Sequence, residues 1–224
     1  FSDKGFTLTV EGYYQNMNNI LGYKEGASFL FIGEEQAGFD WQNNVTAGKG
    51  KSYGGEILLQ KKKGKWSGWI GYTLSWTILQ FDSLNFGKPF YAKYDRRHDA
   101  SIVVMYQLND HISISGTWVY GTGNAVTLPK SEYVALPHSV HAGSSTGYFN
   151  NYFVSDYGDK NSFRMAPYHR ADIGVQFTKK KKNRERIFEV SVYNLYNRKN
   201  PFYYYVGYSD KDQTKRVLRQ VSLF

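Results

Sequence analysis

The sequence predicts an all-β protein, an antiparallel β-barrel that crosses a membrane. Three observations lead to this prediction. About eight segments alternate apolar and polar residues, as strands with two different faces do. The connections between these segments alternate between short and long, and aromatic residues gather near the segment ends. Tight turns at one end of a barrel and long loops at the other are typical of outer-membrane barrels.

The alternating segments follow one another along the whole chain. In the third of them, Trp66, Ile70 and Trp76 share one face, and Ser67 and Thr73 lie on the other. Each segment has about the 9–11 residues that a tilted transmembrane strand needs. The segments are 6–14, 52–60, 66–76, 99–108, 112–120, 170–177, 187–194 and 216–224, the last interpreted as a strand that is cut short.

The connections have a regular rhythm that a soluble β-sandwich would not need. The short turns are 61–65, 109–110 and 178–186. The long links are 25–43, 81–97, 126–166 and 206–215. Two of the short turns hold dense runs of Lys and Arg, and we expect both turns on the same side of the barrel. Such charges keep strand ends out of hydrocarbon and can contact anionic lipid headgroups.

Aromatic residues fit the two membrane interfaces. The chain has 20 Tyr and 15 Phe, which favour strands. Trp66 and Trp76 lie ten residues apart on one face, so together they would reach both interfaces. Two further pairs are expected toward the loop ends of their strands: Trp118 with Tyr120, and Tyr203 with Tyr205.

Charged residues on the strands fall opposite the apolar stripes, and we expect them to face the barrel interior. Ionisable groups are costly against lipid, whereas a lumen that holds water or a polar plug accepts them. Their role would be hydrogen bonding to whatever fills the barrel, or contact with a substrate. These predicted lumen-facing residues are Glu11, Glu56, Asp99, Arg170, Asp172 and Glu189.

Composition excludes several other classes of protein. There is no Cys, so no disulfide and no thiolate metal site can form. No run of about 18 apolar residues predicts a transmembrane helix, and the mean hydropathy of −0.55 fits alternating strands. The net charge of +9 sits largely in turns beside apolar strands, so we predict no nucleic-acid binding. The first residues lack a signal peptide, so we expect a processed chain or a piece of a longer one.

No set of residues predicts catalysis, a cofactor or a metal. His138 and His141 lie in a long link without an acidic or Cys partner, so we interpret them as surface histidines. The run YDRRHD at 94–99 predicts a salt-bridged start of a strand at the barrel rim, because a catalytic site would need a nucleophile or a carboxylate pair in a closed pocket. We therefore expect no enzyme.

The link 126–166 is the best candidate for substrate contact, since its many rings suit sugars or siderophores. Rings that only pack on one another are the alternative. The candidate residues are Tyr133, His138, His141, Tyr148, Phe149, Tyr152 and Tyr157.

Several motifs, taken together and in order, resemble TonB-dependent outer-membrane receptors, most closely those of Bacteroidota-type bacteria. They are SYGGEILLQKKKGKWSGWIGYTLSW at 52–76, YDRRHD at 94–99, WVYGTGNAVTLP at 118–129, YHRADIGVQF at 168–177 and VYNLYNRKNPF at 192–202. The resemblance implies that residues 1–224 are the C-terminal portion of a 22-stranded barrel, with its last strand incomplete. An N-terminal plug, absent from this chain, would close that barrel.

The same resemblance implies a function in the bacterial cell outer membrane. The receptor would import a scarce nutrient, such as a ferric siderophore, haem, cobalamin or an oligosaccharide, using energy from the TonB complex. Its partners would be outer-membrane lipid, its own plug, the TonB complex and a surface lipoprotein. Two alternatives stay open: a self-contained small barrel with a structural or adhesion role, and a soluble carbohydrate-binding β domain. The many inward Ser, Thr and Gly residues would fill an eight-stranded barrel poorly, which favours the larger one.

Overall fold

The computed structural model describes residues 2–3, 5–24, 41–135, 152–182, 184–212 and 215–223. The predicted all-β class is confirmed, because antiparallel strands make up most of these ranges and the helical segments in them are two short 3₁₀ turns, Trp41–Asn44 and Asn85–Gly87. Within these ranges, no helix has the length and apolar character needed to cross a membrane.

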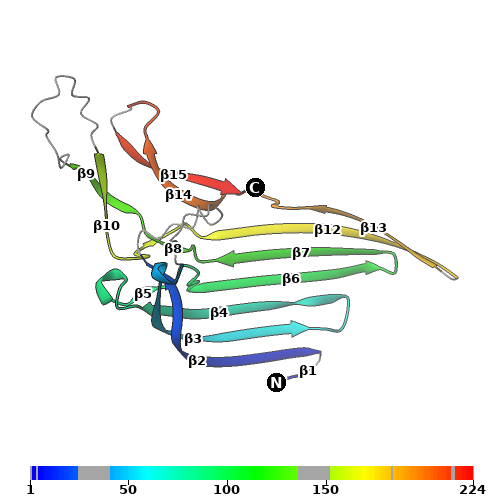
Figure 1. The fold of residues 1–224 in the computed structure, drawn as a ribbon. Coiled ribbons are helices and arrows are strands. Elements are labelled where there is room, and N and C mark those ends of the chain that lie inside the picture. The colour runs from blue at the N-terminus through cyan, green and yellow to red at the C-terminus, as the bar shows by residue number, and fades with distance from the viewer. Residues whose placement is uncertain are drawn as a thin grey trace, which may run out of the picture.

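The largest sheet is antiparallel and has nine strands, in the order β1-β2-β3-β4-β6-β7-β12-β13, with β5 beside β4 (Figure 1). Its strands are β1 (Ser2–Asp3), β2 (Phe6–Tyr23), β3 (Val45–Lys61), β4 (Trp66–Gln80), β5 (Phe90–Tyr91), β6 (His98–Asn109), β7 (Ile112–Gly121), β12 (Tyr168–Lys181) and β13 (Arg184–Val192). Seven of the eight predicted segments lie in this sheet. Several strands extend beyond their predicted ends toward the long connections.

The connections sort onto two opposite ends of the strands, as the sequence predicts. Tight turns join β3 to β4, β6 to β7 and β12 to β13, all at the end that we call the turn edge (right in Figure 1). The long connections leave from the other end, the loop edge. Both lysine-rich turns therefore lie together on the turn edge, which confirms that prediction.

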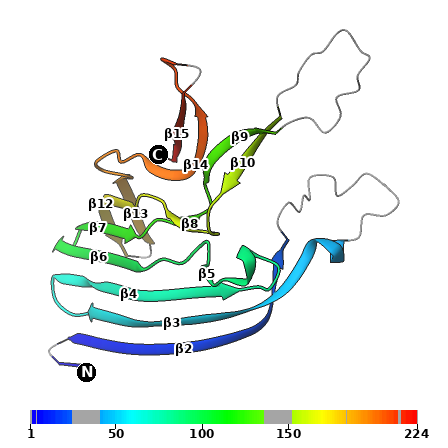
Figure 2. The ribbon, with the colours of Figure 1, turned by 90° about the vertical axis from the view of Figure 1, so that its left-hand side faces the viewer.

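Three small antiparallel pairs lie at the loop edge (Figure 2). They are β8 (Ala125–Val126) with β11 (Phe163–Arg164), β9 (Pro129–Ala135) with β10 (Tyr152–Tyr157), and β14 (Asn200–Tyr208) with β15 (Arg216–Leu223). An ion pair of 2.7 Å between Glu132 and Arg216 joins the second pair to the third. The prediction of a strand at 216–224 is confirmed by β15, which pairs with β14 in a sheet of its own.

The two faces of the main sheet have different chemistry. Cross-strand register places Ile57, Tyr72 and Ala100 opposite one another on one face, which we call the apolar face. The other, the polar face, carries the row Glu56, Thr73 and Asp99. Apolar-face side chains remain open within the described residues: Val10 67%, Ile57 48%, Ile70 48%, Ile173 40%, Phe188 65% and Val190 53% exposed. The stripes therefore do not gather in a sealed core.

The hydrophobic core is small and sits at the loop edge. Phe81, Leu84 and Phe90 are buried together, with Ile20 and Leu79 packed against them. Within the described residues the sheet does not close on itself, since β2 and β13 lie at opposite sides of it (Figure 1). The loop edge is thus the only place in the described chain where apolar side chains are fully enclosed.

Candidate functional site

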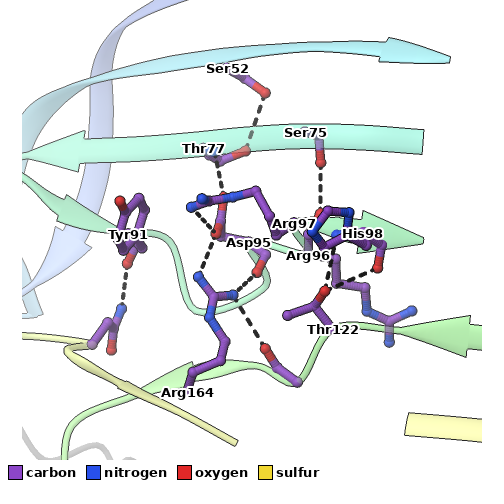
Figure 3. A network of polar contacts seen from close by, with 12 residues as sticks. Ser52, Ser75, Thr77, Tyr91, Asp95, Arg96, Arg97, His98, Thr122 and Arg164 are labelled. Atoms are coloured by element: carbon purple, nitrogen blue, oxygen red, sulfur yellow. Dashed lines mark hydrogen bonds and ion pairs between the residues drawn. The ribbon is translucent and has the colours of Figure 1, made fainter. Parts of the chain in front are cut away.

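A buried carboxylate organises the loop edge. The side chain of Asp95 has no exposed surface, and Arg164 of β11 donates to it at 2.7 Å. Arg97 lies 3.5 Å from the same oxygen, and the backbone amide of Thr77 donates to the other oxygen at 2.6 Å (Figure 3). A buried charge is tolerated only when such partners replace its water. These contacts therefore tie β4, the link 81–97 and β11 to one point.

Backbone hydrogen bonds bring the same segments together. The amide of Ala125 donates to the carbonyl of Lys93 at 3.1 Å, and the amide of Met165 donates to the carbonyl of Asn124 at 3.0 Å. At Gly123 a Cβ atom would lie 2.0 Å from the carbonyl oxygen of Met165. Only glycine permits this approach, so the GTGN run at 121–124 has a packing role.

Aromatic rings form a continuous row along the apolar face at the loop edge. Tyr14 and Tyr53 lie with ring centroids 6.4 Å apart, and Tyr53 stacks on Trp76 at 5.3 Å. The guanidinium of Arg97 lies 5.0 Å from the centroid of Trp76 and 5.1 Å from that of Tyr91. Arg97 thus joins the row to the Asp95 cluster by cation–π contacts as well as by its ion pair.

The turn edge has a second set of rings on the same face. Trp66 of β4 and Tyr106 of β6 lie with centroids 4.3 Å apart, and Phe177 of β12 faces Phe188 of β13 at 6.3 Å. The prediction that Trp66 and Trp76 share a face, at opposite ends of one strand, is confirmed. Aromatic rows bound the apolar face at both ends.

The YDRRHD run has the structure that the sequence predicts, a salt-bridged start of a strand. Arg96 and Asp99 form an exposed ion pair of 3.2 Å, and Asp95 forms the buried one described above. Sequence reasoning missed Arg164, which is 69 residues away from Asp95. No local signal marks Arg164, because its partner is brought near only by the fold.

A second buried side chain, Asn200, fixes the start of β14. Its amide group donates to the carbonyl of His169 at 3.0 Å and accepts from the amide of His169, also at 3.0 Å. Arg198 donates to the same side-chain oxygen at 3.2 Å and to the carbonyl of Pro167 at 3.0 Å. The Asn200 side chain therefore continues the edge of β12 as a strand backbone would.

The turn before Asn200 depends on two further asparagines. Asn194 and Asn197 have φ of 54° and 51°, a left-handed conformation that Asn tolerates better than most residues. The backbone amide of Asn194 donates to Asp172 at 2.8 Å. The side chain of Asn194 donates to the backbone carbonyl of Arg198 and accepts from the backbone amide of Arg198. The VYNLYNRKNPF motif at 192–202 thus encodes the turn that carries the chain from β13 to β14.

We expect Asn200→Ala to loosen this junction. Both backbone groups of His169 would lose their partners while still half-buried, at a cost of about 2–3 kcal/mol. Limited proteolysis should then cut between β13 and β15 at least tenfold faster than in the unmodified protein. Gln107→Ala is the control, since Gln107 is exposed at the turn edge and donates to the carbonyl of Asn109, away from this junction. Equal cleavage rates of the two variants would contradict this assignment.

The predicted lumen-facing residues all lie on the polar face. Register places Glu11 opposite Glu56, and Thr73 lies between Glu56 and Asp99. Glu11, Glu56 and Asp99 line a shallow cavity of about 260 Å³ together with Trp69 and Ser101. Like charges directly opposite each other are destabilising, so this face suits a partner with positive charge or hydrogen-bond donors. That the face meets a barrel lumen stays a prediction.

The other three predicted lumen residues lie on β12 and β13. Arg170 and Asp172 form an ion pair of 2.9 Å, and the guanidinium of Arg170 lies 4.0 Å from the ring centroid of Tyr193. Arg170 also donates to Tyr168 at 3.1 Å. Register puts Glu189 beside Gln176, two rows from this group. The charges of Arg170 and Asp172 thus neutralise each other, whereas Glu11 and Glu56 are like charges on opposite strands.

The predicted substrate loop is described only at its base. Tyr133 on β9 and Tyr157 on β10 are 58% and 57% exposed. Tyr152 pairs through its backbone with Ala135, but its side chain is not described. His138, His141, Tyr148 and Phe149 lie outside the described residues. Substrate contact by these residues stays a prediction.

Within the ranges that the structure describes, no group of three His, Asp or Glu side chains is placed to hold a metal ion. No protein-family model matches the chain, and no curated protein matches it.

Proposed function

We propose that this chain forms part of the wall of an outer-membrane importer of the TonB-dependent kind, which takes up a scarce nutrient. One observation carries the proposal: the sheet has an exposed apolar face with aromatic rows at both ends. Large exposed apolar surfaces mark places where a protein meets another protein or a membrane. Here the aromatic borders favour a bilayer, because Trp and Tyr prefer its two interfaces.

The height of the apolar face fits a bilayer. Trp66 and Trp76 are ten residues apart on β4, which is about 33 Å along a strand. Tilted by about 45°, that stretch rises about 23 Å, close to the apolar band of about 25 Å on outer-membrane barrels. Ile70 would then lie near the bilayer midplane.

The two ends of the strands supply a direction. Short periplasmic turns and long outer loops are the rule in these barrels, so the turn edge would face the periplasm and the loop edge the outside. The loop edge is also where Asp95 and Asn200 hold long connections in fixed positions. Fixed loops suit ligand recognition, because the ligand then does not have to order them.

The open sides of the sheet support a barrel larger than this sheet. β2 and β13 are not paired with each other, and unpaired backbone groups cannot remain in hydrocarbon. We infer that further strands of the same barrel cover them, in keeping with the 22 strands that the family resemblance implies. A self-contained barrel of about eight strands would instead require β2 to pair with β13 or β15.

The polar face would line the interior, with Glu11, Glu56 and Asp99 toward the plug. The nutrient would be a ferric siderophore, haem, cobalamin or an oligosaccharide, and exposed Tyr133 and Tyr157 would lie on its path. The partners would be the receptor's own plug, the TonB complex and a surface lipoprotein. In a soluble carbohydrate-binding domain, this apolar face would be exposed to water, which is unfavourable.

Deletion of the gene tests the transport function. The strain should fail to grow on one of four limiting sources, namely a ferric siderophore, haem, cobalamin or a single glycan, and uptake of the labelled nutrient should fall at least tenfold. A protonophore should abolish the same uptake in the parent strain, since TonB-coupled import uses the proton-motive force. Unchanged uptake of every nutrient would reject the importer.

A further inference from the structure

A cavity on the outward, apolar face lies beyond the aromatic row at the loop edge. It measures about 520 Å³ and is lined by three neighbouring strands and Pro89. The strand residues are Asn16, Met17 and Asn18 of β2, Lys49, Gly50 and Lys51 of β3, and Ile78, Leu79 and Gln80 of β4. No Asp or Glu lines it. The chemistry of this face thus changes from apolar to basic and amide-rich within two residues of the rings.

Register shows that the polar side chains share the face of the rings. Tyr14, Tyr53 and Trp76 form one cross-strand row. Two residues further along each strand, Asn16, Lys51 and Ile78 form the next row on the same face. One step of two residues is about 7 Å, so Lys51 lies just outside the aromatic border.

The following row repeats the pattern. Asn18, Lys49 and Gln80 are opposite one another, which gives the cavity a lysine and an asparagine in each of two successive rows. The residue between the two lysines, Gly50, faces the other way, where a Cβ would lie 2.7 Å from Ile20. The cavity floor is therefore backbone packed on the loop-edge core, and its walls carry cationic and amide groups beside Ile78 and Pro89.

The two lysines carry positive charge that nothing else in the described chain neutralises. Both are exposed, and within the described ranges neither forms an ion pair. Asn16 is oriented by Tyr14, whose hydroxyl donates to it at 3.1 Å. Two ammonium groups and amide donors beside the apolar Ile78 and Pro89 suit an amphiphilic anion that offers several oxygen acceptors.

We propose that this cavity binds the phosphate headgroup of a glycolipid in the outer leaflet. This inference rests on the proposed location of the protein in an outer membrane, where the aromatic row at the loop edge would mark the outer interface. The acyl chains would then lie against Ile57 and Val10, while the phosphate meets Lys49 and Lys51. A lysine close to an anionic membrane surface adds about 1 kcal/mol to binding.

The test uses the protein expressed from its own gene and purified from outer membranes in detergent. Three probes are compared by equilibrium binding: phosphorylated lipid A, the same lipid A without phosphate, and inorganic phosphate. The double variant Lys49→Gln/Lys51→Gln should bind phosphorylated lipid A roughly tenfold to thirtyfold more weakly. The control Lys62→Gln/Lys65→Gln, at the exposed turn edge, should bind like the unmodified protein. Heat-modifiable migration in gels checks that every variant is folded.

Three outcomes would overturn the proposal: full binding by the Lys49/Lys51 variant, equal binding of lipid A without phosphate, or displacement of lipid A by inorganic phosphate at a matching concentration. The last would indicate a site for free phosphate. The outcomes also separate this inference from the proposed function. Absence of the protein from the outer-membrane fraction would reject both, whereas correct location and nutrient uptake with unaltered lipid binding in the variant would reject only the lipid site.

Discussion

Replacing Asp95 with Ala should release the loop edge while the main sheet stays formed. The change removes the carboxylate that pairs with Arg97 and Arg164, which are 25% and 29% exposed. Removing one partner of a buried ion pair costs about 3–5 kcal/mol of stability. Because the two arginines are partly exposed, we expect a cost of about 3 kcal/mol. Hydrogen exchange should therefore become roughly hundredfold faster for amides of the clustered segments, such as Ala92 and Ala125.

The matched control is another Asp in the same motif. Asp99 pairs with Arg96 at 3.2 Å, but its side chain is 40% exposed, so Asp99→Ala should change stability by no more than about 0.5 kcal/mol. The exchange rates in Asp95→Asn should fall between those of Asp95→Ala and Asp99→Ala. Asn keeps the shape of Asp and an oxygen that accepts from the amide of Thr77. Equal exchange rates in the Asp95 and Asp99 variants would show that burial of the charge does not organise the loops.

Placing Arg at Ile70 should strongly impair insertion into a bilayer. Ile70 is 48% exposed on the apolar face, between Trp66 and Trp76 on β4. A cation on the lipid face of a barrel costs about 2–4 kcal/mol at the midplane, whereas an exposed site in water tolerates it within about 0.5 kcal/mol. Urea unfolding of the Ile70→Arg variant in lipid vesicles should show a free energy of unfolding lowered by about 2–4 kcal/mol. The fraction of protein that folds into the vesicles should also fall.

Ser101→Arg is the matched control, since it puts the same cation on the opposite face. Ser101 lines the same cavity as Glu11, Glu56 and Asp99, so the new guanidinium can form ion pairs with these carboxylates. Its stability in vesicles should equal or exceed that of the unmodified protein. The proposed orientation of the sheet would be wrong if Ser101→Arg were the more damaging change.

The strands could be predicted from the sequence because each strand's pattern is local. Alternation with period two assigns Trp66, Ile70 and Trp76 to one face whatever the strand pairs with. The same rule assigned Glu11, Glu56 and Asp99 to a common face, and cross-strand register confirmed it. Turn length is also local, so the division into a turn edge and a loop edge followed from the sequence.

The strand at 216–224 was predictable from the sequence, but its pairing partner was not. Alternation shows that a segment can form a strand, but it does not name the neighbour. After β13 ends at Val192, a turn held by Asn194 and Asn197 leads to Asn200 at the start of β14, and the side chain of Asn200 bonds His169. Single side-chain hydrogen bonds of this kind have no periodic signature.

The sequence by itself determined an all-β chain with one apolar and one polar face, since residues two apart in a strand must share a side. Only the tertiary structure brought Arg164 to Asp95, Asn200 to His169, and Lys49 and Lys51 to one cavity with Asn16. Those contacts join residues far apart in the chain, or on neighbouring strands whose register is set by their full length. Their energies depend on burial and distance, which the chain acquires only on folding.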